Sequence, residues 1–425
     1  MLTPTSYPPP PAAPQLRKLE ALRRSADLLR KYGGPGFSRP SINVSFSDGV
    51  SPAGVTQHAC QLCGDCVSGC NYAAKNTLLM NYLPDAKAHG SQMFTEVSVR
   101  RLERRGGRWL VYYELLDAGR ERFAPREMTV TADFVILAAG TLGSTEILLR
   151  SREQARAEPG LTLSDQLGHG FSANGDMWGF GYNTEVPING VGAGRLRPNP
   201  GEPVGPCITG MIDMRDQPQL DDGMVIQEGV IPGALARLIP AALGGAVLLF
   251  GGDTRAPVKE SLKEEARRLI KYLRGPYHGA VRNTQTFLVM GHDSAGGRMY
   301  LHRDRLRIAW PEVDRQPIFA RAERRLREAT RDLGGTYLKN PFNPVTVHPL
   351  GGCRMAEDAS SGVVDHEGRV FSGRHGVEVC CGLYVCDGSI MPRSLGVNPL
   401  LTISALAERM CALMAQRNGW HIDYS

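Results

Sequence analysis

The stretch HPLGGC (348–353) decides the fold together with two stretches that follow it, GLYVCDGS (382–389) and GVNPLLTISALAER (396–409). The first predicts a tight glycine turn after His348. The second predicts a short apolar strand that ends at Asp387-Gly388. The third predicts a turn that leads directly into a helix, with Asn398 as its N-cap and Pro399 in its first turn.

The beginning of this predicted helix is suited to a ligand. Its first turn presents backbone N–H groups without intrahelical acceptors, together with the positive end of the helix dipole. Such an end binds a group that is anionic or becomes anionic during a reaction. Taken singly, Asn398 could serve only as a helix cap and His348 only as a turn residue. Their occurrence together, between glycine-rich turns, favours a functional interpretation.

These motifs resemble the C-terminal half of the glucose-methanol-choline (GMC) oxidoreductases, and are most similar to bacterial cholesterol-oxidase-type members. The resemblance implies FAD as the cofactor and a catalytic pair, His348 and Asn398, at flavin N5. It implies that the helix after Asn398 stabilises the reduced flavin. The cofactor contacts that it implies are Val97, Ala138, Gly140, Asn174, Gly175, Asp387, Gly388, Asn398, Pro399 and Leu400.

A second strand–turn–helix lies earlier in the chain. Residues 128–138 (MTVTADFVILA) predict a buried strand, and a glycine-containing turn leads it into a helix over 144–150. The pattern alone is weak, because glycine at such turns often serves packing. The resemblance implies that this segment approaches the FAD ribose and adenine, that the Val97 backbone grips the adenine, and that Asn174-Gly175 faces the flavin.

The resemblance implies oxidation of the CH–OH group of a small hydrophobic alcohol, for which a sterol is the expected example. Hydride would pass to flavin N5 while His348 accepts or orients the hydroxyl proton. Sterol-oxidising relatives also isomerise a double bond with a glutamate of the substrate domain. Glu228, the only glutamate between Glu202 and Glu260, does not align with that role. Transient contact with a membrane surface is compatible with such a substrate.

One part of the family's fold is not found in the sequence. Members begin with a βαβ unit that carries G-x-G-x-x-G and holds the FAD pyrophosphate. The glycines at 190, 192 and 194 lack a strand–helix frame, and nothing before Cys60 qualifies. We therefore expect an incomplete FAD clamp. Two alternatives stay open: a non-catalytic fragment that needs a separate N-terminal part, and an iron–sulfur electron-transfer protein.

The iron–sulfur alternative rests on Cys60, Cys63, Cys66 and Cys70, which have the C-x2-C-x2-C-x3-C spacing of bacterial ferredoxins. Asn71 follows them where ferredoxins have proline. The fourth cysteine of that run serves a second cluster in ferredoxins, and this sequence has no second run. We therefore expect no metal site but a thiol-rich loop beside the flavin, and rank an iron–sulfur or zinc site below it.

Composition indicates an ordinary globular protein, with 42% hydrophobic and 22% charged residues and a net charge of +6 over 425 residues. No basic block favours nucleic acid. Ten cysteines without a signal peptide or a membrane-spanning run indicate free thiols or metal binding rather than a disulfide framework, and we expect the protein in the cytoplasm. The oligomeric state stays open.

We predict a mixed α/β fold, in which a partial Rossmann-like FAD-binding domain is interleaved with an antiparallel-sheet substrate domain. The expected parts are a Pro-rich lead and helix (1–39), an incomplete FAD-binding domain (40–165 and 345–425) and a substrate domain (166–344). Within the last, the apolar stretch 230–252 is either a buried helix or the lining or lid of a substrate site.

Overall fold

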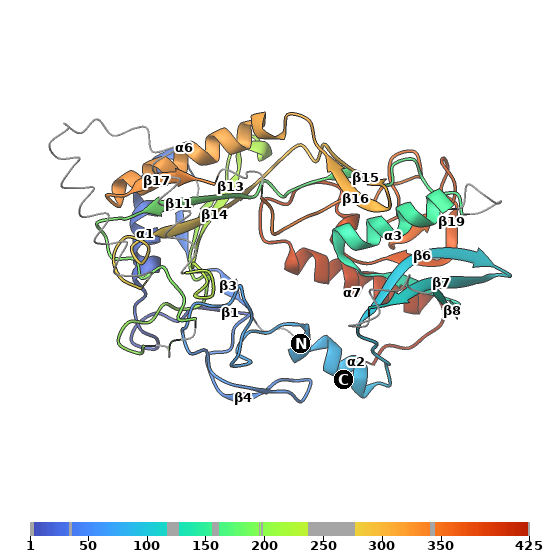
Figure 1. Cartoon of the computed structure of the whole chain (residues 1–425), viewed down its shortest axis with the longest axis horizontal. Helices are drawn as coiled ribbons and strands as arrows, with labels where there is room; N and C mark the ends of the chain where they lie inside the picture. Colours follow the sequence, from blue (N-terminus) through green and yellow to red (C-terminus); the bar gives the residue numbers. More distant parts are fainter. Residues whose placement is uncertain are drawn as a thin grey trace. The chain divides into compact units, whose positions relative to one another are not determined.

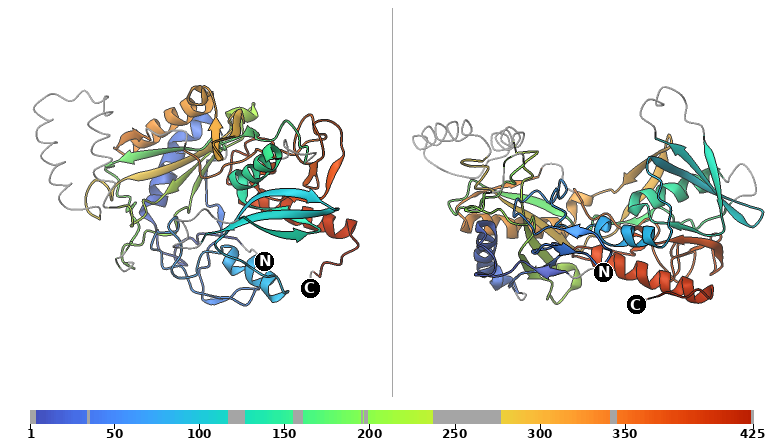
Figure 2. Two further views of the ribbon diagram at one scale, coloured as in Figure 1. Left: turned by 45° about the vertical axis from the view of Figure 1, so that its right-hand side comes forward. Right: turned by 90° about the horizontal axis from the view of Figure 1, so that it is seen from below.

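The computed structural model describes residues 4–33, 36–116, 127–154, 161–194, 196, 199–236, 277–340 and 345–423. Its contacts divide the chain into two compact units. Unit 1 comprises Met1–Met93, Met177–Met290 and Pro317–Asn343, and unit 2 comprises Phe94–Asp176, Gly291–Gln316 and Pro344–Ser425. Each unit combines helices with sheets that are mostly antiparallel (Figures 1 and 2), which confirms the mixed α/β class.

This division differs from the expected domain boundaries in three places. Residues 40–93 belong to unit 1, although we expected them in the FAD-binding domain. Residues 166–176 and 291–316 belong to unit 2 instead of the substrate domain. The chain therefore alternates between the units more often than the motifs alone suggested.

Unit 1 is built on a six-stranded antiparallel sheet with the order β17-β11-β14-β13-β12-β2. The strands are β2 (Gly36–Ser38), β11 (Met177–Tyr182), β12 (Met211–Met214), β13 (Met224–Gly229), β14 (Gln285–Gly291) and β17 (Thr336–Lys339). Helix α6 (Pro317–Asp332) packs on β11 and β17, and helix α1 (Arg17–Leu29) packs on α6, β2, β12 and β13. The spacing of Phe319, Ala322 and Leu326 in the sequence predicts one apolar helix face, and all three side chains are buried in α6.

Helix α1 departs from its predicted pattern at one residue. The leucine spacing predicts one apolar face that includes Leu19, Leu22 and Leu29, with the Lys and Arg side chains on the solvated face. These leucines are buried, but Lys18 also has only 1% of its side chain exposed. Its Nζ lies 2.8 Å from Oε1 of Glu228, which is fully buried in β13. Backbone N–H groups of Thr209 and Gly210 also donate to Glu228, at 2.6 and 2.9 Å. A buried lysine is stable here because its charge is paired and hydrogen-bonded.

Unit 2 contains three small sheets, with the orders β6-β7-β8, β18-β19-β9 and β10-β15-β16. Their strands are β6 (Val97–Arg105), β7 (Arg108–Leu115), β8 (Met128–Ala132), β9 (Val135–Leu137), β10 (His169–Phe171), β15 (Gly297–His302), β16 (Arg305–Ala309), β18 (Arg369–Phe371) and β19 (Val379–Val385). Strands β19 and β9 are parallel. Helices α3 (Gly140–Gln154) and α7 (Leu400–Arg417) complete the unit around a core that includes Trp109, Leu148 and Leu383.

The remaining elements are short and lie in or beside the loops. They are β1 (Thr5–Ser6), β3 (Ser41–Ile42), β4 (Gly49–Val50), β5 (Thr56–Gln57), α2 (Tyr82–Ala88) and the 3-10 turns η1 (Arg30–Tyr32), η2 (Leu78–Met80), η4 (Leu220–Asp222), η5 (Val313–Arg315) and η6 (Gly388–Ile390).

Several predicted elements have different bounds in the structure. The single strand expected over 128–138 is two strands, because the chain bends at Asp133, whose carboxylate accepts a 2.8 Å hydrogen bond from Arg108. Residues 41–46 alternate in the sequence as a strand does, but only Ser41–Ile42 form one. Of the apolar stretch 230–252, residues 237–252 lie outside the described residues.

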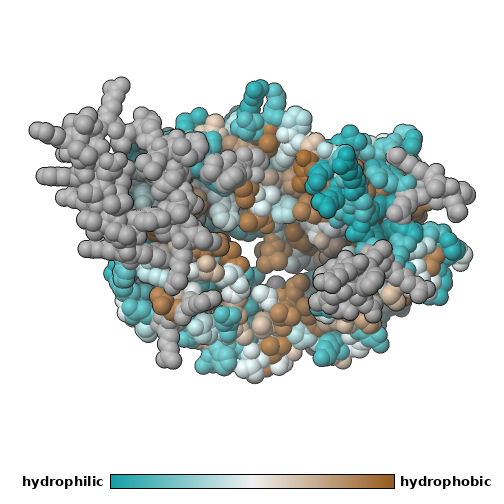
Figure 3. All heavy atoms as spheres, in the orientation of Figure 1, coloured by the Kyte–Doolittle hydropathy of each residue, from teal (hydrophilic) through white to brown (hydrophobic). Residues whose placement is uncertain are grey.

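The surface is mainly polar but includes apolar patches, which are brown in Figure 3. In unit 2 the exposed apolar side chains include Phe134, Ile136, Leu142 and Leu400. None of the helices in the described ranges is both long enough and apolar enough to cross a membrane.

The Lys18–Glu228 pair predicts a large and specific loss of stability. Lys18→Met should lower the free energy of unfolding by about 3–5 kcal/mol, because it leaves a buried carboxylate without its cation. Urea unfolding followed by circular dichroism measures the loss. Arg17→Ala is a matched control on the same helix, since Arg17 forms an exposed 3.5 Å pair with Glu202, and should cost about 0–1 kcal/mol. Equal stability of the two variants would contradict the role of the pair.

Candidate active site

A buried carboxylate holds His348. The Nδ1 atom of His348 lies 3.0 Å from Oδ1 of Asp176, whose side chain has no exposed surface, whereas 14% of the His348 side chain is exposed. The other oxygen, Oδ2, accepts from the Thr346 hydroxyl at 3.0 Å and from the Val347 N–H at 2.9 Å. An ionised carboxylate can only accept hydrogen bonds, so neutral His348 carries its proton on Nδ1 and keeps a lone pair on Nε2.

The side chain of Asn398 faces the Nε2 atom of His348. Its Nδ2 is 3.5 Å from Nε2 of His348, at the outer limit of a hydrogen bond. Both residues belong to unit 2 and both are partly buried. The structure therefore brings together the two residues that the sequence singled out, although 50 positions separate them. Together they offer a proton acceptor and an amide to one hydroxyl group.

The helix after Asn398 begins one residue later than predicted. Pro399 is the N-cap of α7 and already has helix-like angles, φ −83° and ψ −10°. The Ile403 N–H donates to the Pro399 carbonyl at 2.9 Å. The prediction that Asn398 caps the helix is therefore wrong. Its side chain lies beside His348 instead, and the first turn of α7 has no side-chain cap.

Asn174 holds the turn that carries Asn398. Its Oδ1 accepts from the N–H groups of Leu395 at 2.8 Å and Gly396 at 3.1 Å, and its Nδ2 donates to the Val397 carbonyl at 2.8 Å. Asn174 is fully buried, with the left-handed φ of 57° that asparagine tolerates. Its amide is therefore used in fixing residues 395–397.

Gly175 is fixed by a second buried carboxylate. Oδ2 of Asp293 accepts from the Gly175 N–H at 2.8 Å, the Ala173 N–H at 2.9 Å and the Ser172 hydroxyl at 3.0 Å. A Cβ at position 175 would lie 2.6 Å from the Gly291 backbone, and φ is 61°. Only glycine fits there, so the loop can place Asp176 beneath His348.

Asp387 joins the DGS turn to helix α3. Its Oδ1 accepts from the backbone and hydroxyl of Ser389, at 2.8 and 2.6 Å. Its Oδ2 accepts from the Gly140 N–H at 3.0 Å and from the Ser144 hydroxyl. These bonds use the carboxylate to position backbone. Gly388 beside it is buried, and a Cβ there would lie 3.0 Å from the Thr141 hydroxyl.

The junction of β9 and α3 leaves backbone accessible to a ligand. Ala138 is exposed, and a Cβ at Gly140 would meet nothing within 4 Å. Leu400, at the beginning of α7, is 51% exposed. Val97 is the partly buried first residue of β6 and pairs with Leu115. All the predicted cofactor contacts lie in unit 2 together with His348.

Sequence reasoning missed Asp176, Asp293 and Thr346. Asp176 follows Asn-Gly and precedes strand β11, which is a usual place for a loop carboxylate. Nothing in the sequence links it to a histidine 172 positions away. A carboxylate between an Asn-Gly turn and an apolar strand was the one available signal.

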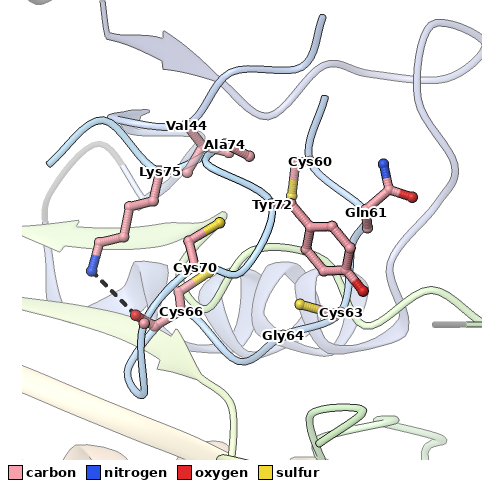
Figure 4. Close-up of a pocket in the computed structure, with 11 residues that line it drawn as sticks. Val44, Cys60, Gln61, Cys63, Gly64, Cys66, Cys70, Tyr72, Ala74 and Lys75 are labelled. Atoms are coloured by element: carbon pink, nitrogen blue, oxygen red, sulfur yellow. Dashed lines mark hydrogen bonds between the residues drawn. The ribbon is translucent and has the colours of Figure 1, made fainter. Parts of the chain in front are cut away.

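The four cysteines of the loop 60–70 lie in unit 1 and line one pocket (Figure 4). Burial raises the pKa of the Cys60 thiol to about 12, and the neighbouring Cys66, Cys63 and Cys70 add to this increase. Among the described residues, no group of three or more His, Cys, Asp or Glu side chains is arranged to hold a metal ion.

Two family models, both described as GMC oxidoreductase, match residues 43–170 and 280–407. A cholesterol oxidase of Mycobacterium tuberculosis is 30% identical over 411 residues, which cover 90% of this chain and 63% of that protein. A cholesterol oxidase of Acinetobacter baumannii is 26% identical over 397 residues, which cover 89% of this chain and 63% of that protein. The chain thus spans somewhat less than two thirds of these curated relatives.

A solved structure, a pyridoxine 4-oxidase from Mesorbium loti, aligns with a TM-score of 0.52 at 18% identity. The alignment covers 98% of this chain and 72% of that one, and supports the fold class.

The Asp176 contact predicts the tautomer of His348. In protein with ¹⁵N-labelled histidine, we expect neutral His348 to carry its proton on Nδ1. Asp176→Asn should shift the population toward the Nε2–H form, because an amide can donate to Nδ1. Imidazole ¹⁵N shifts report the tautomer. Thr346→Val, which keeps the carboxylate, is the control and should leave the tautomer unchanged. An unaltered tautomer in Asp176→Asn would remove this role from Asp176.

Proposed function

Because this chain belongs to the GMC oxidoreductase family, we propose that it carries the catalytic pair of an FAD-dependent enzyme that oxidises the CH–OH group of a hydrophobic alcohol. The observation that carries the proposal is the line of contacts from Asp176 through His348 to Asn398. A sterol is the substrate class that we favour.

His348 has the properties of a general base for an alcohol. The Asp176 carboxylate fixes the proton on Nδ1, so the lone pair of Nε2 points toward Asn398 and is available to a substrate hydroxyl. When Nε2 takes the hydroxyl proton, the buried carboxylate stabilises the imidazolium that forms. The Asn398 amide, whose Nδ2 lies 3.5 Å from Nε2 of His348, would hold the hydroxyl oxygen in place.

The residues of unit 2 fit the flavin end of FAD. The 18-residue helix α7 begins at Leu400, two residues after Asn398, and its first turn has no side-chain cap. Its N–H groups and dipole favour negative charge at that place. The uncovered backbone at Ala138 and Gly140, beside the N-terminus of α3, offers FAD a second contact site. When bound, FAD supplies the hydride acceptor for the alcohol carbon.

Fewer observations support a binding site for the nucleotide end of FAD. The sequence has no G-x-G-x-x-G turn between a strand and a helix. In the described part of unit 2, β9 ends its sheet, and Ile136 at its centre is 46% exposed. Strand β9 is parallel to β19, as the strands of a dinucleotide-binding sheet are. We therefore propose that a βαβ unit in addition to the described residues completes the clamp at β9.

The preference for a sterol rests on similarity to the two cholesterol oxidases. Such a substrate would be collected by transient contact with a membrane surface, which we include in the proposal. An isomerase step that uses Glu228 is not part of it. The Glu228 carboxylate is fully buried and paired with Lys18, so it is not available as a base.

The direct test is a titration of the purified chain with FAD, followed by absorbance and then by sterol turnover. Retention of flavin through desalting, with reduction of the flavin by a sterol, would support the proposal. Retained flavin that no alcohol reduces would contradict it. If the chain takes up FAD only when a βαβ unit is supplied, the chain alone is the non-catalytic fragment that the sequence left as an alternative.

His348→Ala should lower kcat by roughly 10²–10⁴-fold, because it removes the proton acceptor. Steady-state turnover with FAD bound measures this effect. His366→Ala is the matched control in the same unit, since 65% of the His366 side chain is exposed, and it should keep the wild-type rate. A His348→Ala enzyme within a few-fold of wild type would exclude His348 from the reaction.

Asn398→Ala should slow flavin reduction more than it weakens substrate binding, because the amide orients the hydroxyl at the reacting centre. Stopped-flow reduction at saturating alcohol separates the two effects. A change confined to KM, with kcat unaltered, would contradict the placement of Asn398 beside the reacting hydroxyl.

A further inference from the structure

The cysteine loop of unit 1 converges on a single pocket. Cys60, Cys63, Cys66 and Cys70 all line it, together with Val44, Ala74, Tyr72 and Lys75. Figure 4 shows that the four side chains come from successive turns of the loop, with their sulfur atoms directed into the pocket. The Lys75 ammonium points away and donates to the Cys66 carbonyl at 3.2 Å. The space inside the pocket is small, with a volume of about 20 Å³.

Contacts that do not use the thiols hold the loop in place. The Asp65 carboxylate accepts from the N–H groups of Gly194 and Gly233, both at 2.7 Å. The Cys60 N–H donates to the Ser45 carbonyl at 3.0 Å, and the Cys63 carbonyl accepts from Ala193 at 2.8 Å. The loop is therefore positioned by its backbone and by Asp65, so its sulfur atoms are left for another partner.

The arrangement disfavours a single metal ion. Zinc binds four thiolates at about 2.3 Å, which requires sulfur atoms about 3.8 Å apart around one point. In the described part of the chain no set of side chains meets the requirement for one ion. A polynuclear cluster differs, because inorganic sulfide and several irons fill the space between the cysteines. The four thiols are free, and the pocket lies between them.

We propose that this pocket binds a [4Fe–4S] cluster through Cys60, Cys63, Cys66 and Cys70. The sequence favoured a metal-free loop, because the fourth cysteine of a ferredoxin run serves a second cluster. Here the fourth cysteine faces the same pocket as the other three, so one cluster needs no remote ligand. The proposal is independent of the proposed oxidation, because it uses residues of unit 1 and the catalytic pair lies in unit 2.

The test is metal analysis of the full chain, purified without oxygen and then treated with ferrous iron and sulfide. We expect about four irons and four labile sulfides per chain, with a broad visible absorbance that dithionite bleaches. The paired variant Cys63→Ser/Cys66→Ser should lose the iron and the absorbance. Cys381→Ser, which removes an exposed thiol of unit 2, should retain both, and so should His348→Ala.

Three results would overturn the proposal. The first is a wild-type chain that stays colourless and free of iron after the treatment. The second is uptake of one ion without labile sulfide, which would indicate a mononuclear site. The third is full iron content in the folded Cys63→Ser/Cys66→Ser variant. Because the first two results come from the wild-type chain, they decide the question even if the paired variant does not fold.

Discussion

A buried carboxylate must accept hydrogen bonds from nearby donors, and in unit 2 this requirement fixes the positions of the candidate site residues. Asp176 has no exposed surface, so both of its oxygens must be satisfied inside the protein. It meets this need with the His348 ring, the Thr346 hydroxyl and the Val347 backbone. The same contacts fix the ring position and the tautomer of His348. Asp293 and Asp387 act similarly by accepting hydrogen bonds from the backbone N–H groups of Gly175 and Gly140, and so fix the backbone that we propose lies next to FAD.

The second half of the site depends on amide geometry. Asn174 uses its carbonyl oxygen and its NH₂ group to fix the turn at 395–397. That turn delivers Asn398 to within 3.5 Å of His348. Neither asparagine acts as a helix cap, so the first turn of α7 has no side-chain cap at the place where the proposed chemistry develops negative charge. The cost of an uncapped helix is consistent with a functional use of its end.

Local patterns in the sequence predicted local structure well. The apolar face of α6 corresponds to the structure. The proximity of His348 to Asn398, which the family resemblance implied, does so too. The sequence could not predict the contacts between polar side chains that lie far apart along the chain. Asp176 with His348, and Lys18 with Glu228, are separated by 172 and 210 positions. Periodicity assigns a face to each residue, but it does not identify the partner, and for Lys18 it assigned the wrong face.

The pairing of Lys18 with Glu228 also has a consequence for how the chain is made. Helix α1 is synthesised before its partners, because its buried lysine meets its carboxylate only after 210 further residues, and α6 follows later still. At the usual rate of synthesis this interval is roughly 10–40 s. During that time the amphipathic helix has no complete sheet to cover. Helix α1 therefore waits for its core partners, and a chaperone has that interval in which to bind it.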